Sequence, residues 1–449
     1  VRPPVFSTAI LPEAGLMGFL NPQQISGIVG KGVKLADLYL PVKINGDMAL
    51  LKALELLLLE FERKSPGEVF DQKFIADKTV GYDAFIKQFD EYKLDALAEA
   101  SGVSKAALYD AAQMLAFKKR IIICWGMGLT QQPNGVDMIR EIVNLLLLKG
   151  SIGKPGAGVC PVRGHSNVQG NRTMMINEKP TSEQLDRLQQ VFGFNPPRQH
   201  GYGVVGAIKA MHEEKLKVLF CMGGNFLSAT PDTGYTAEAV RKLHLTVSVS
   251  TKLNRGHLVH GNESIILPTR SRSDIDRVNG EQQFVSTENS MGVVESSRGM
   301  LQPVSDDLMN ETQIVCRMAI ATLGARSVVN WKRYHDSYDA VRDDIEKCIP
   351  GFDSYNIRVR QKGGFYLPNA AREGNFITRQ FGDSAPFTLT TAPDNFLKQD
   401  EYMMATVRTH DQFNTTIYGL DDRYRGIKNE RRVIFMNPKD IGKAGFMPG

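Results

Sequence analysis

Residues 156–170 are Gly-Ala-Gly-Val-Cys-Pro-Val-Arg-Gly-His-Ser-Asn-Val-Gln-Gly, and the fold is inferred outward from this stretch. It combines glycines with Arg163, His165 and the amides of Asn167 and Gln169. Neither a helical nor a strand period is present, so we expect a loop. Glycine lets a backbone approach a ligand closely, and arginine offers a planar charged fork for a carboxylate or phosphate. The same composition also suits a glycine-rich connection between two domains.

The size and composition of the chain indicate a soluble α/β protein. Its 449 residues are long for one hydrophobic core, so roughly two to four domains are expected. Apolar residues make up 42% and glycines number 41, which fits many turns. The net charge of +5 is small for this length and is spread without a basic block. A nucleic-acid partner is therefore not expected.

The cysteines predict a reducing environment. No pair has C-x-x-C spacing and the number of cysteines is odd, which argues against a disulfide framework and against an iron–sulfur or zinc site built by these residues. We therefore expect a cytoplasmic protein. The longest leucine runs are too short to span a membrane, and no signal peptide is visible. The five cysteines are Cys124, Cys160, Cys221, Cys316 and Cys348.

A strand, a turn and a helix are predicted early in the chain. Leu38–Ile44 alternates like a short strand and is followed by Asn45–Gly46–Asp47. A helix is expected over Met48–Lys64 with Asp47 as its N-cap. In α/β folds this arrangement holds phosphates and riboses, although it is also an ordinary strand–turn–helix.

Two further α/β patterns follow. The first has a buried strand at Arg120–Cys124, a loop from Trp125 and a helix over Val136–Lys149. The side chains of Trp125 and Met127 can equally be core packing against that helix. The second pattern has strands that end in glycine-rich or polar residues, where open parallel sheets bind ligands. These strands are Lys217–Cys221, Leu245–Val249 and Ser264–Pro268.

Two motifs resemble a known family. Val159–Gly170 is similar to the segment N-P-x-R-G-Q-N-N-V-Q-G of molybdopterin-dependent formate dehydrogenases. Upstream, Trp125–Gln131 resembles their W-G-M-G-x-T-Q, at a similar distance. Gln282–Asn289 resembles the family's G-x-F-x-N-x-E-G turn without the first glycine. The chain is thus similar to the formate-dehydrogenase-like branch of molybdopterin oxidoreductase alpha subunits.

This resemblance implies an α/β fold in four parts. Two related nucleotide-binding parallel-sheet lobes are expected at 1–165 and 166–290, and a mostly helical region at 291–395. The start of a C-terminal β-barrel domain is expected at 396–449, opening with a strand over Met403–His410. The resemblance also implies a fragment that lacks an N-terminal part, which would carry a [4Fe-4S] cluster and the metal-ligating residue. No metal ligand is therefore expected here.

The cofactor implied by the resemblance is a bis(molybdopterin guanine dinucleotide) with molybdenum or tungsten. The loop that would bind the second nucleotide departs from the family pattern. It has Phe226 where proline is common and Gly224–Asn225 where acids are common. Arg408 and His410 can equally belong to a solvated loop. The cofactor-binding candidates are Asn45, Gly46, Asp47, Trp125, Gly126, Met127, Gly128, Gln131, Gly164, Asn167, Gln169, Gly170, Gly223, Gly224, Asn225, Ser250, Thr251, Arg408, Thr409 and His410.

Arg163 and His165 are the catalytic candidates. Arg163 aligns with the family's active-site arginine, which implies that it orients the carboxylate of formate. His165 stands where formate dehydrogenases usually have glutamine, and it can hydrogen-bond the pterin, relay a proton or be structural.

The expected activity is two-electron oxidation of formate or a similar small substrate. The alternatives are an oxyanion or S-oxide reductase of the same superfamily, and a non-catalytic nucleotide-binding scaffold. A small-molecule substrate and an electron-acceptor protein are the expected partners. The fragment alone is expected to be inactive.

Overall fold

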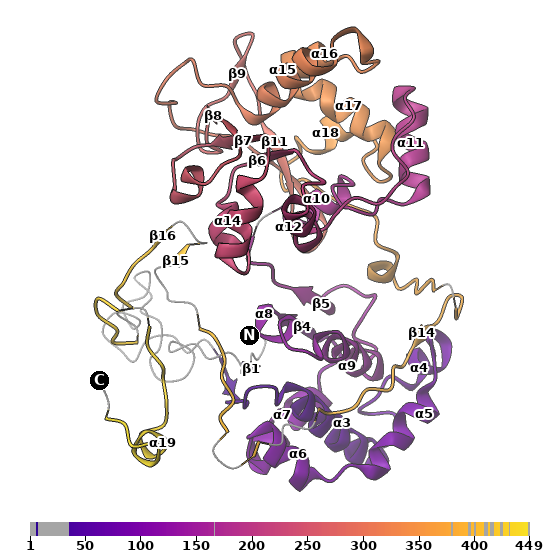
Figure 1. Cartoon of the computed structure of the whole chain (residues 1–449). Coiled ribbons are helices and arrows are strands. Elements are labelled where there is room, and N and C mark those ends of the chain that lie inside the picture. Colours follow the sequence, from indigo (N-terminus) through magenta and orange to yellow (C-terminus); the bar gives the residue numbers. More distant parts are fainter. Residues whose placement is uncertain are drawn as a thin grey trace, which may run out of the picture. The chain divides into compact units, whose positions relative to one another are not determined.

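The computed structural model describes most of the chain as two compact units (Figure 1). The described residues are 6–7, 36–165, 167–378, 380–393, 397–398, 401–407, 412–413, 417–422, 425–430 and 432–447. The first unit comprises Val1–Pro196, Phe284–Ser297 and Tyr338–Ala405, and the second comprises Pro197–Gln283, Arg298–Ser337 and Thr406–Gly449. The chain thus returns to the first unit twice, whereas the four expected domains are continuous segments. The boundaries of those domains stay a prediction.

The first unit begins with short strands and a set of packed helices (Figure 1). Its early elements are β1 Phe6–Ser7, β2 Leu38–Tyr39, α3 Asp47–Lys64, α4 Gln72–Lys78, β3 Thr79–Val80, α5 Tyr82–Lys87, η1 Gln88–Glu91, α6 Leu94–Ser101 and α7 Lys105–Ala116. The elements β4 Ile122–Trp125, α8 Met127–Thr130, α9 Gly135–Leu148, β5 Gly158–Pro161, α10 Val168–Thr173 and α11 Ser182–Phe192 follow. The predicted helix at 48–64 and the helix at 136–149 are confirmed.

The expected N-cap of α3 is wrong by one residue. Gly46 occupies the cap position and makes no side-chain hydrogen bond, whereas Asp47 is the first helical residue. There its carboxylate accepts a hydrogen bond from Gln132 Nε2 at 3.1 Å. A carboxylate in the first turn still interacts favourably with the helix dipole. The Asp47 side chain therefore contacts a residue far along the chain instead of capping the helix.

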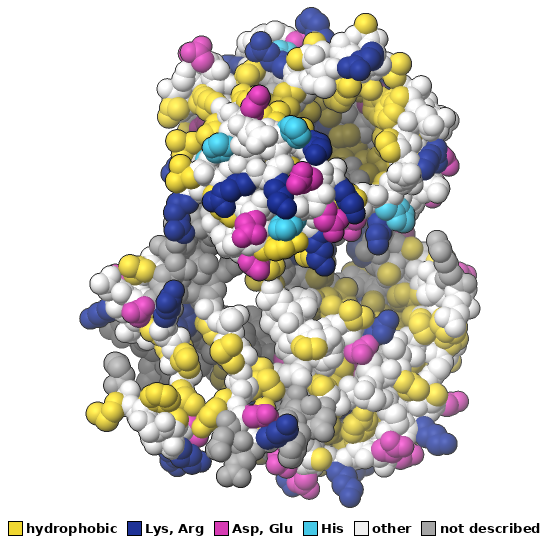
Figure 2. Space-filling model, in the orientation of Figure 1, with side chains coloured by type: hydrophobic (Ala, Val, Ile, Leu, Met, Phe, Trp, Pro, Cys, Tyr) yellow, Lys and Arg dark blue, Asp and Glu magenta, His cyan; other side chains and the backbone are white. Residues whose placement is uncertain are grey.

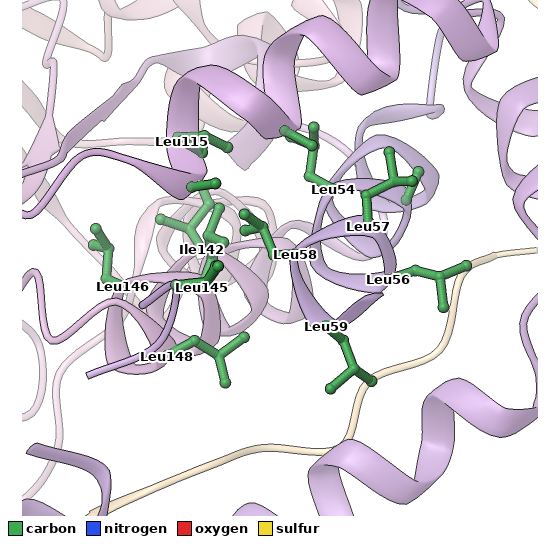
Figure 3. Packing of buried hydrophobic residues seen from close by; sticks show 14 of the residues in the cluster. Leu54, Leu56, Leu57, Leu58, Leu59, Leu115, Ile142, Leu145, Leu146 and Leu148 are labelled. Carbon is green, nitrogen blue, oxygen red and sulfur yellow. The ribbon is translucent and has the colours of Figure 1, made fainter. Parts of the chain in front are cut away.

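A leucine-rich core joins α3, α7 and α9. Leu58 of α3 projects toward Ile142 and Leu145 of α9, and Leu115 comes from α7 (Figure 3). All four side chains are buried. Burying such a side chain stabilises a fold by about 1.5–3 kcal/mol. This core holds α9 in place. The Trp125–Gln131 motif precedes α9, and it is not the loop that the sequence predicts, because Trp125 ends β4 and Met127–Thr130 form the short helix α8.

A charged cluster is enclosed in the same helical layer. Lys52 Nζ lies 2.6 Å from Glu141 Oε1, and both side chains are fully buried. The other Glu141 oxygen accepts hydrogen bonds from Thr390 Oγ1 at 2.5 Å and Asn144 Nδ2 at 2.8 Å. Burial and the nearby Glu141 raise the pKa of Glu55 well above its usual range, which favours the neutral form of Glu55 beside the pair.

The stretch 156–170 is not entirely a loop. Gly158–Pro161 forms β5, which pairs in parallel with β4 from Ile122↔Gly158 to Trp125↔Pro161. Val168–Thr173 forms the short helix α10. A four-residue strand gives little periodicity, and its stability comes from pairing with β4 rather than from local sequence. Among the described residues, the irregular part of this stretch after β5 is therefore 162–165.

The rest of the first unit is a small antiparallel sheet packed against helices. Arg342 of α17 stacks on Phe284 at 3.9 Å, and the hydroxyls of Ser286 and Tyr355 lie 2.5 Å apart. These contacts fix the position of β11, which the site uses. The elements are β11 Val285–Glu288, β12 Val293–Ser297, α17 Tyr338–Cys348, α18 Tyr355–Arg358, β13 Phe365–Tyr366, η4 Ala370–Glu373 and β14 Ala385–Pro386.

The second unit is built on a three-stranded parallel sheet in the order β6-β7-β8. Ile208 and Met211 of α12 pack with Val240 of α14 and with Leu219 of β6. The three predicted strands of this lobe are confirmed within one residue. Its first elements are α12 Val204–His212, β6 Val218–Met222, α13 Phe226–Ala229, α14 Thr233–Arg241, β7 Leu245–Ser250, η2 Arg255–Leu258 and β8 Glu263–Pro268.

The later elements of the second unit are short. They are β9 Arg277–Val278, β10 Glu281–Gln282, α15 Glu311–Leu323, η3 Gly324–Arg326, α16 Trp331–Asp336, β15 Gln412–Phe413, β16 Ile417–Tyr418 and α19 Pro438–Lys443. The strand expected over Met403–His410 is wrong for residues 403–407, which have no paired strand among the described residues. Without a neighbouring strand an apolar run cannot complete its backbone hydrogen bonds as a sheet. The start of a barrel domain stays a prediction.

Together the two units confirm the α/β class, because each contains parallel strands and packed helices. Positive and negative side chains are interspersed on the face shown in Figure 2, in agreement with the small net charge. Within the described ranges, no helix combines the length and apolar character needed to cross a bilayer.

Candidate functional site

In the first unit, the two motifs of the sequence start side by side. Val162 N donates to Trp125 O at 2.7 Å, which continues the β4–β5 ladder to the end of both strands. A Cβ added to Gly126 would lie 3.8 Å from Val162 O. The backbone of the first motif therefore runs close to the residue that precedes Arg163.

The Trp125–Gln131 motif divides into a packed part and an exposed part. Trp125 packs against the leucine core, so the core-packing alternative holds for its side chain. Met127 is 48% exposed and lies outside the core, and Gln131 Nε2 lies 3.7 Å from its sulfur. Gly128 faces open space, since a Cβ there would meet no atom within 4 Å. Only the second part of the motif is thus available to a ligand.

Gln132 connects this motif to the Asn45–Asp47 turn. Its Nε2 atom donates to Gly128 O at 2.7 Å and to Asp47 Oδ2 at 3.1 Å. Burial raises the pKa of Asp47, and the hydrogen bond from Gln132 opposes that rise. Asn45 adopts a positive φ of 59° and turns the chain into Gly46. Sequence reasoning missed Gln132, which brings two separately predicted elements together.

Two buried amides near this connection have unused hydrogen-bonding capacity. The Oε1 atom of Gln132 and both side-chain polar atoms of Asn134 find no hydrogen-bond partner among the described residues. An unsatisfied buried polar group costs about 1–3 kcal/mol, which a ligand group can offset. Asn134 occupies the N-cap position of α9, although its side chain makes no cap hydrogen bond.

Arg163, Gly164 and His165 lie exposed beyond the end of β5. In the part of the chain that the structure describes, no hydrogen bond or ion pair engages the Arg163 guanidinium. A Cβ on Gly164 would meet no atom within 4 Å. Arg163 therefore presents its charged fork to whatever occupies the space beside β4 and β5.

The end of the stretch 156–170 is held by Glu288 of β11. Gln169 Nε2 donates to Glu288 Oε1 at 2.7 Å, and Glu288 N donates to Asn167 Oδ1 at 3.0 Å. Asn167 has a positive φ of 64° and caps α10, and a Cβ on Gly170 would lie only 2.0 Å from its Oδ1. These three residues have partners within the protein, so they position the Arg163 loop. Their contact with a cofactor stays a prediction.

A second candidate site lies at the carboxyl ends of β6 and β7 in the second unit. Gly223 and Gly224 have positive φ values of 67° and 76°, which only glycine adopts without strain. They border a cavity of about 50 Å³ together with Asn225 and Ser250. Asn225 Oδ1 is buried and has no hydrogen-bond partner among the described residues. The structure thus brings these four predicted cofactor residues to one cavity, and their contact with a cofactor stays a prediction.

Two residues of this cavity were not predicted as ligands. Asn254 and His257 line it, and they hold each other through a hydrogen bond from Asn254 N to His257 Nδ1 at 3.0 Å. The polar run after β7 was the available signal, but it does not show which side chain turns inward. Thr251 is exposed and does not line the cavity. Burial raises the pKa of Cys221 in the cavity wall.

Three candidates, Arg408, Thr409 and His410, lie outside the described residues. Among the residues that are described, no three His, Cys, Asp or Glu side chains gather closely enough to hold a metal ion.

Comparison with known proteins gives the family. A family model described as molybdopterin oxidoreductase matches residues 25–268. An uncharacterised oxidoreductase of Mycobacterium tuberculosis (strain ATCC 25618 / H37Rv) is 48% identical over 439 residues, covering 98% of this chain and 56% of that protein. Protein YdeP of Escherichia coli (strain K12) is 42% identical over 437 residues, covering 96% and 57%.

More distant matches are functionally named. Formate dehydrogenase H of Escherichia coli (strain K12) is 36% identical over 328 residues, covering 71% of this chain and 42% of that protein. The solved structure of acetylene hydratase from Pelobacter acetylenicus covers 64% of this chain and 41% of its own, with a TM-score of 0.46 and 17% identity. The chain spans a little over half the length of the two curated relatives that it matches along nearly its whole length. From the family model and these identities, we conclude that the chain belongs to the molybdopterin oxidoreductase family.

Proposed function

We propose that the protein is a molybdopterin-dependent oxidoreductase that removes two electrons from formate or a similarly small anion. The observation that carries this proposal is Arg163, exposed at the end of β5 beside the glycine-rich start of the other motif. A guanidinium with no partner among the described residues is a suitable receptor for a small carboxylate. Membership in the family supports a pterin cofactor with molybdenum or tungsten.

The residues present fit a pterin dinucleotide at both sites. In the first unit, Gly126 and Gly128 let a ligand approach the backbone closely. The side-chain polar atoms of Asn134 have no hydrogen-bond partner among the described residues. In the second unit, Gly223 and Gly224 leave similar room, and Asn225 Oδ1 is an orphaned acceptor in the cavity wall. Backbone N–H groups in glycine-rich turns bind phosphates, and buried amides bind base edges. We therefore extend the proposal to two guanine dinucleotides.

A bound pterin metal supplies the two-electron chemistry, and the protein supplies position and charge. Arg163 would bind both oxygens of the substrate carboxylate and fix its orientation. His165 would hold or move a proton at one of its ring nitrogens. The Glu288 contacts with Asn167 and Gln169 would keep the Arg163 loop in one position.

An oxyanion or S-oxide reductase is the second candidate function. It is favoured by His165, because the formate dehydrogenase pattern has glutamine at that position. An imidazole can deliver a proton to a leaving oxygen, which a reductase needs and an amide cannot do. A proton-donating His165 therefore suits reduction as well as oxidation.

The test is formate-dependent reduction of a redox dye by the full-length protein that contains this sequence and by its Arg163→Ala and Arg163→Lys variants. We expect Arg163→Ala to lose on the order of 10²-fold or more in kcat/KM, since it removes both orientation and charge. Arg163→Lys should retain part of the activity. Equal metal content in all three proteins is the control, and unchanged turnover in Arg163→Ala would overturn the role of Arg163.

The role of His165 has a separate test. The His165→Gln variant restores the residue of the formate dehydrogenase pattern. If His165 moves a proton, the pH–rate profile changes in the variant while the metal content does not. Identical profiles would remove the proton role. Turnover of an oxyanion or S-oxide, with none of formate, would select the second candidate function.

We also propose an electron acceptor, an electron-transfer cluster and a cellular location for the reaction. An electron-acceptor protein would take the two electrons, and a [4Fe-4S] cluster in a part of the protein outside this sequence would pass them on. A cytoplasmic location is proposed because none of the five cysteines has the spacing of a disulfide framework.

A further inference from the structure

Two cysteines face each other across the pair of strands that carries both motifs. In the parallel register of β4 and β5, Cys124 is the direct partner of Cys160. Neighbouring strands lie about 4.8 Å apart. Disulfides join residues whose Cα atoms are about 4.4–6.8 Å apart, so the backbone spacing already suits a covalent bond between these two residues.

Both thiols lie on the same face of this strand pair. Ile123 and Val159, the partners one position earlier, pack against the leucine core, as does Trp125 one position later. Because side chains alternate along a strand, Cys124 and Cys160 project from the opposite face. Cys124 is exposed and Cys160 is partly exposed, so small reagents can reach the pair.

The Cys160 thiol also acts on the Cys124 thiol. Partial desolvation, and then the neighbouring Cys160 thiol, raise the pKa of the Cys124 thiol. The direction of this shift agrees with the strand register, which sets the two cysteines opposite each other.

We propose that Cys124 and Cys160 form a redox-active thiol pair, which a hydroperoxide oxidises reversibly to a disulfide that links β4 to β5. The site is separate from the proposed pterin chemistry and needs no metal. It is formed by the residues directly before Trp125 and Pro161, the register pair that precedes Gly126 and Arg163 along the two segments.

The reaction balances with a hydroperoxide as the only oxidant. The thiolate of one cysteine attacks the terminal peroxide oxygen, the O–O bond breaks, and a sulfenic acid and an alcohol (or water) result. The second thiol then attacks the sulfenic sulfur, the S–S bond forms and water leaves. Two electrons pass from the two thiols to the peroxide. A small-molecule dithiol reverses the change by thiol–disulfide exchange.

The chain provides a matched control on the other sheet. Cys221 occupies β6 as Cys124 occupies β4, but its register partner on β7 is Ser248. It therefore has a similar position in a parallel strand and lacks a second thiol opposite to it. The Cys160→Ser variant converts the first pair into the same cysteine–serine arrangement.

The experiment treats the purified natural protein with hydrogen peroxide, blocks free thiols with iodoacetamide and maps peptides by mass spectrometry. We expect a cross-linked peptide pair containing Cys124 and Cys160, lighter by two hydrogens than the reduced pair and released by dithiothreitol. Cys221 should remain alkylated. Oxidation should become faster as the pH rises, since the raised pKa of Cys124 limits its thiolate.

The variants complete the test. The disulfide should be absent from Cys160→Ser and should form normally in Cys221→Ser. The proposal is overturned if the natural protein keeps both thiols alkylatable while the peroxide oxidises other cysteines. It is equally overturned if Cys124 proceeds to a sulfinic acid without a cross-link. Neither readout depends on enzyme turnover, so it stands apart from the proposed function.

Discussion

At the scale of single residues, the absence of a side chain at Gly170 leaves space for the Asn167 amide, which helps to hold the stretch 156–170 in position. A Cβ at this position would meet Asn167 Oδ1 at 2.0 Å, and that oxygen accepts the hydrogen bond from Glu288 N. In Gly170→Ala the amide of Asn167 must move, and the lost hydrogen bond costs about 1–3 kcal/mol. The helix propensity of alanine returns up to about 1 kcal/mol. We expect a net loss of about 1 kcal/mol in the free energy of unfolding by denaturant titration.

A double-mutant cycle isolates the cause of this loss. With Asn167→Ala already in place, Gly170→Ala no longer meets the amide, so its cost should vanish or become a small gain. If Gly170→Ala costs the same in both backgrounds, contact with Asn167 is not the reason for the glycine.

Glu55 gives a pH-dependent prediction at the same scale. Its pKa is raised well above 4.5 in the folded protein, so the stability due to its neutral form is complete below pH 4.5 and is lost as the pH rises through the folded pKa. Glu55→Gln keeps a neutral side chain at every pH. Its free energy of unfolding relative to the natural protein should therefore increase from pH 5 to pH 8. A difference that is flat over this range would show that Glu55 is ionised in the fold.

Glu141→Gln is the matched change in the same cluster. It leaves the buried ammonium of Lys52 without its carboxylate partner, which lies at 2.6 Å in the natural protein. Breaking a buried pair in this way costs about 3–5 kcal/mol. Glu55→Gln is thus expected to gain stability relative to the natural protein as the pH rises, whereas Glu141→Gln is expected to lower the free energy of unfolding.

Sequence reasoning proposed residues that could contact a ligand, but it did not identify the residues that support them. Arg163 and the glycines were recognisable because their residue types fit ligands directly. Gln132 and Glu288 were missed as supports because their partners Asp47 and Gln169 are far away in sequence. A side chain with a distant partner leaves no local pattern, so only the fold reveals its role.

At the scale of helices and strands, the end of α9 depends on one lysine. Lys149 follows the last helical residue, and its ammonium donates hydrogen bonds to Val69 O and to Ala116 O, the latter at 2.9 Å. Burial lowers its pKa from 10.5 to about 8. Between these values the unfolded chain holds a proton that the folded protein lacks, so the folded state gains stability as the pH rises.

The prediction compares the natural protein with Lys149→Met from pH 8 to pH 10. The difference in the free energy of unfolding should shift in favour of the natural protein by about 1–3 kcal/mol over this range. Chemical denaturation at several pH values measures it. A constant difference would mean that Lys149 keeps its ordinary pKa.

Helices and strands with a clear local pattern of apolar residues were predictable from the sequence. α3, α9 and the strands of the second unit have clear apolar patterns and were placed within one or two residues. β5 was missed because a short strand with a glycine and a proline is defined by its pairing with β4. The Met403–Val407 strand was predicted from its apolar residues, yet among the described residues it has no partner.

At the scale of the whole molecule, both units present a glycine-rich turn at the end of a parallel strand. If these turns hold a pterin cofactor, the Arg163 loop becomes covered when the cofactor binds. Trypsin cleaves after arginine, and Arg163 is exposed in a loop. We expect cleavage after Arg163 in protein from a host that cannot make the pterin, and protection in protein from a competent host.

Arg198 is the internal control for this digestion, because it is exposed in an irregular segment and is not one of the predicted cofactor residues. Its cleavage should be equal in the two preparations. Cleavage after Arg163 at equal rates, with different pterin content, would show that the cofactor does not contact this loop.

The central claim is a pterin-bound metal in an enzyme of this family, and its most direct measurement is cofactor content. The natural protein, made in a host that synthesises the cofactor, would be analysed for molybdenum and tungsten and for the fluorescence of pterin released by acid. The account predicts about one metal and two pterins per chain, because two dinucleotides hold one metal. A folded protein with neither metal nor pterin would contradict the enzyme proposal and favour a nucleotide-binding scaffold.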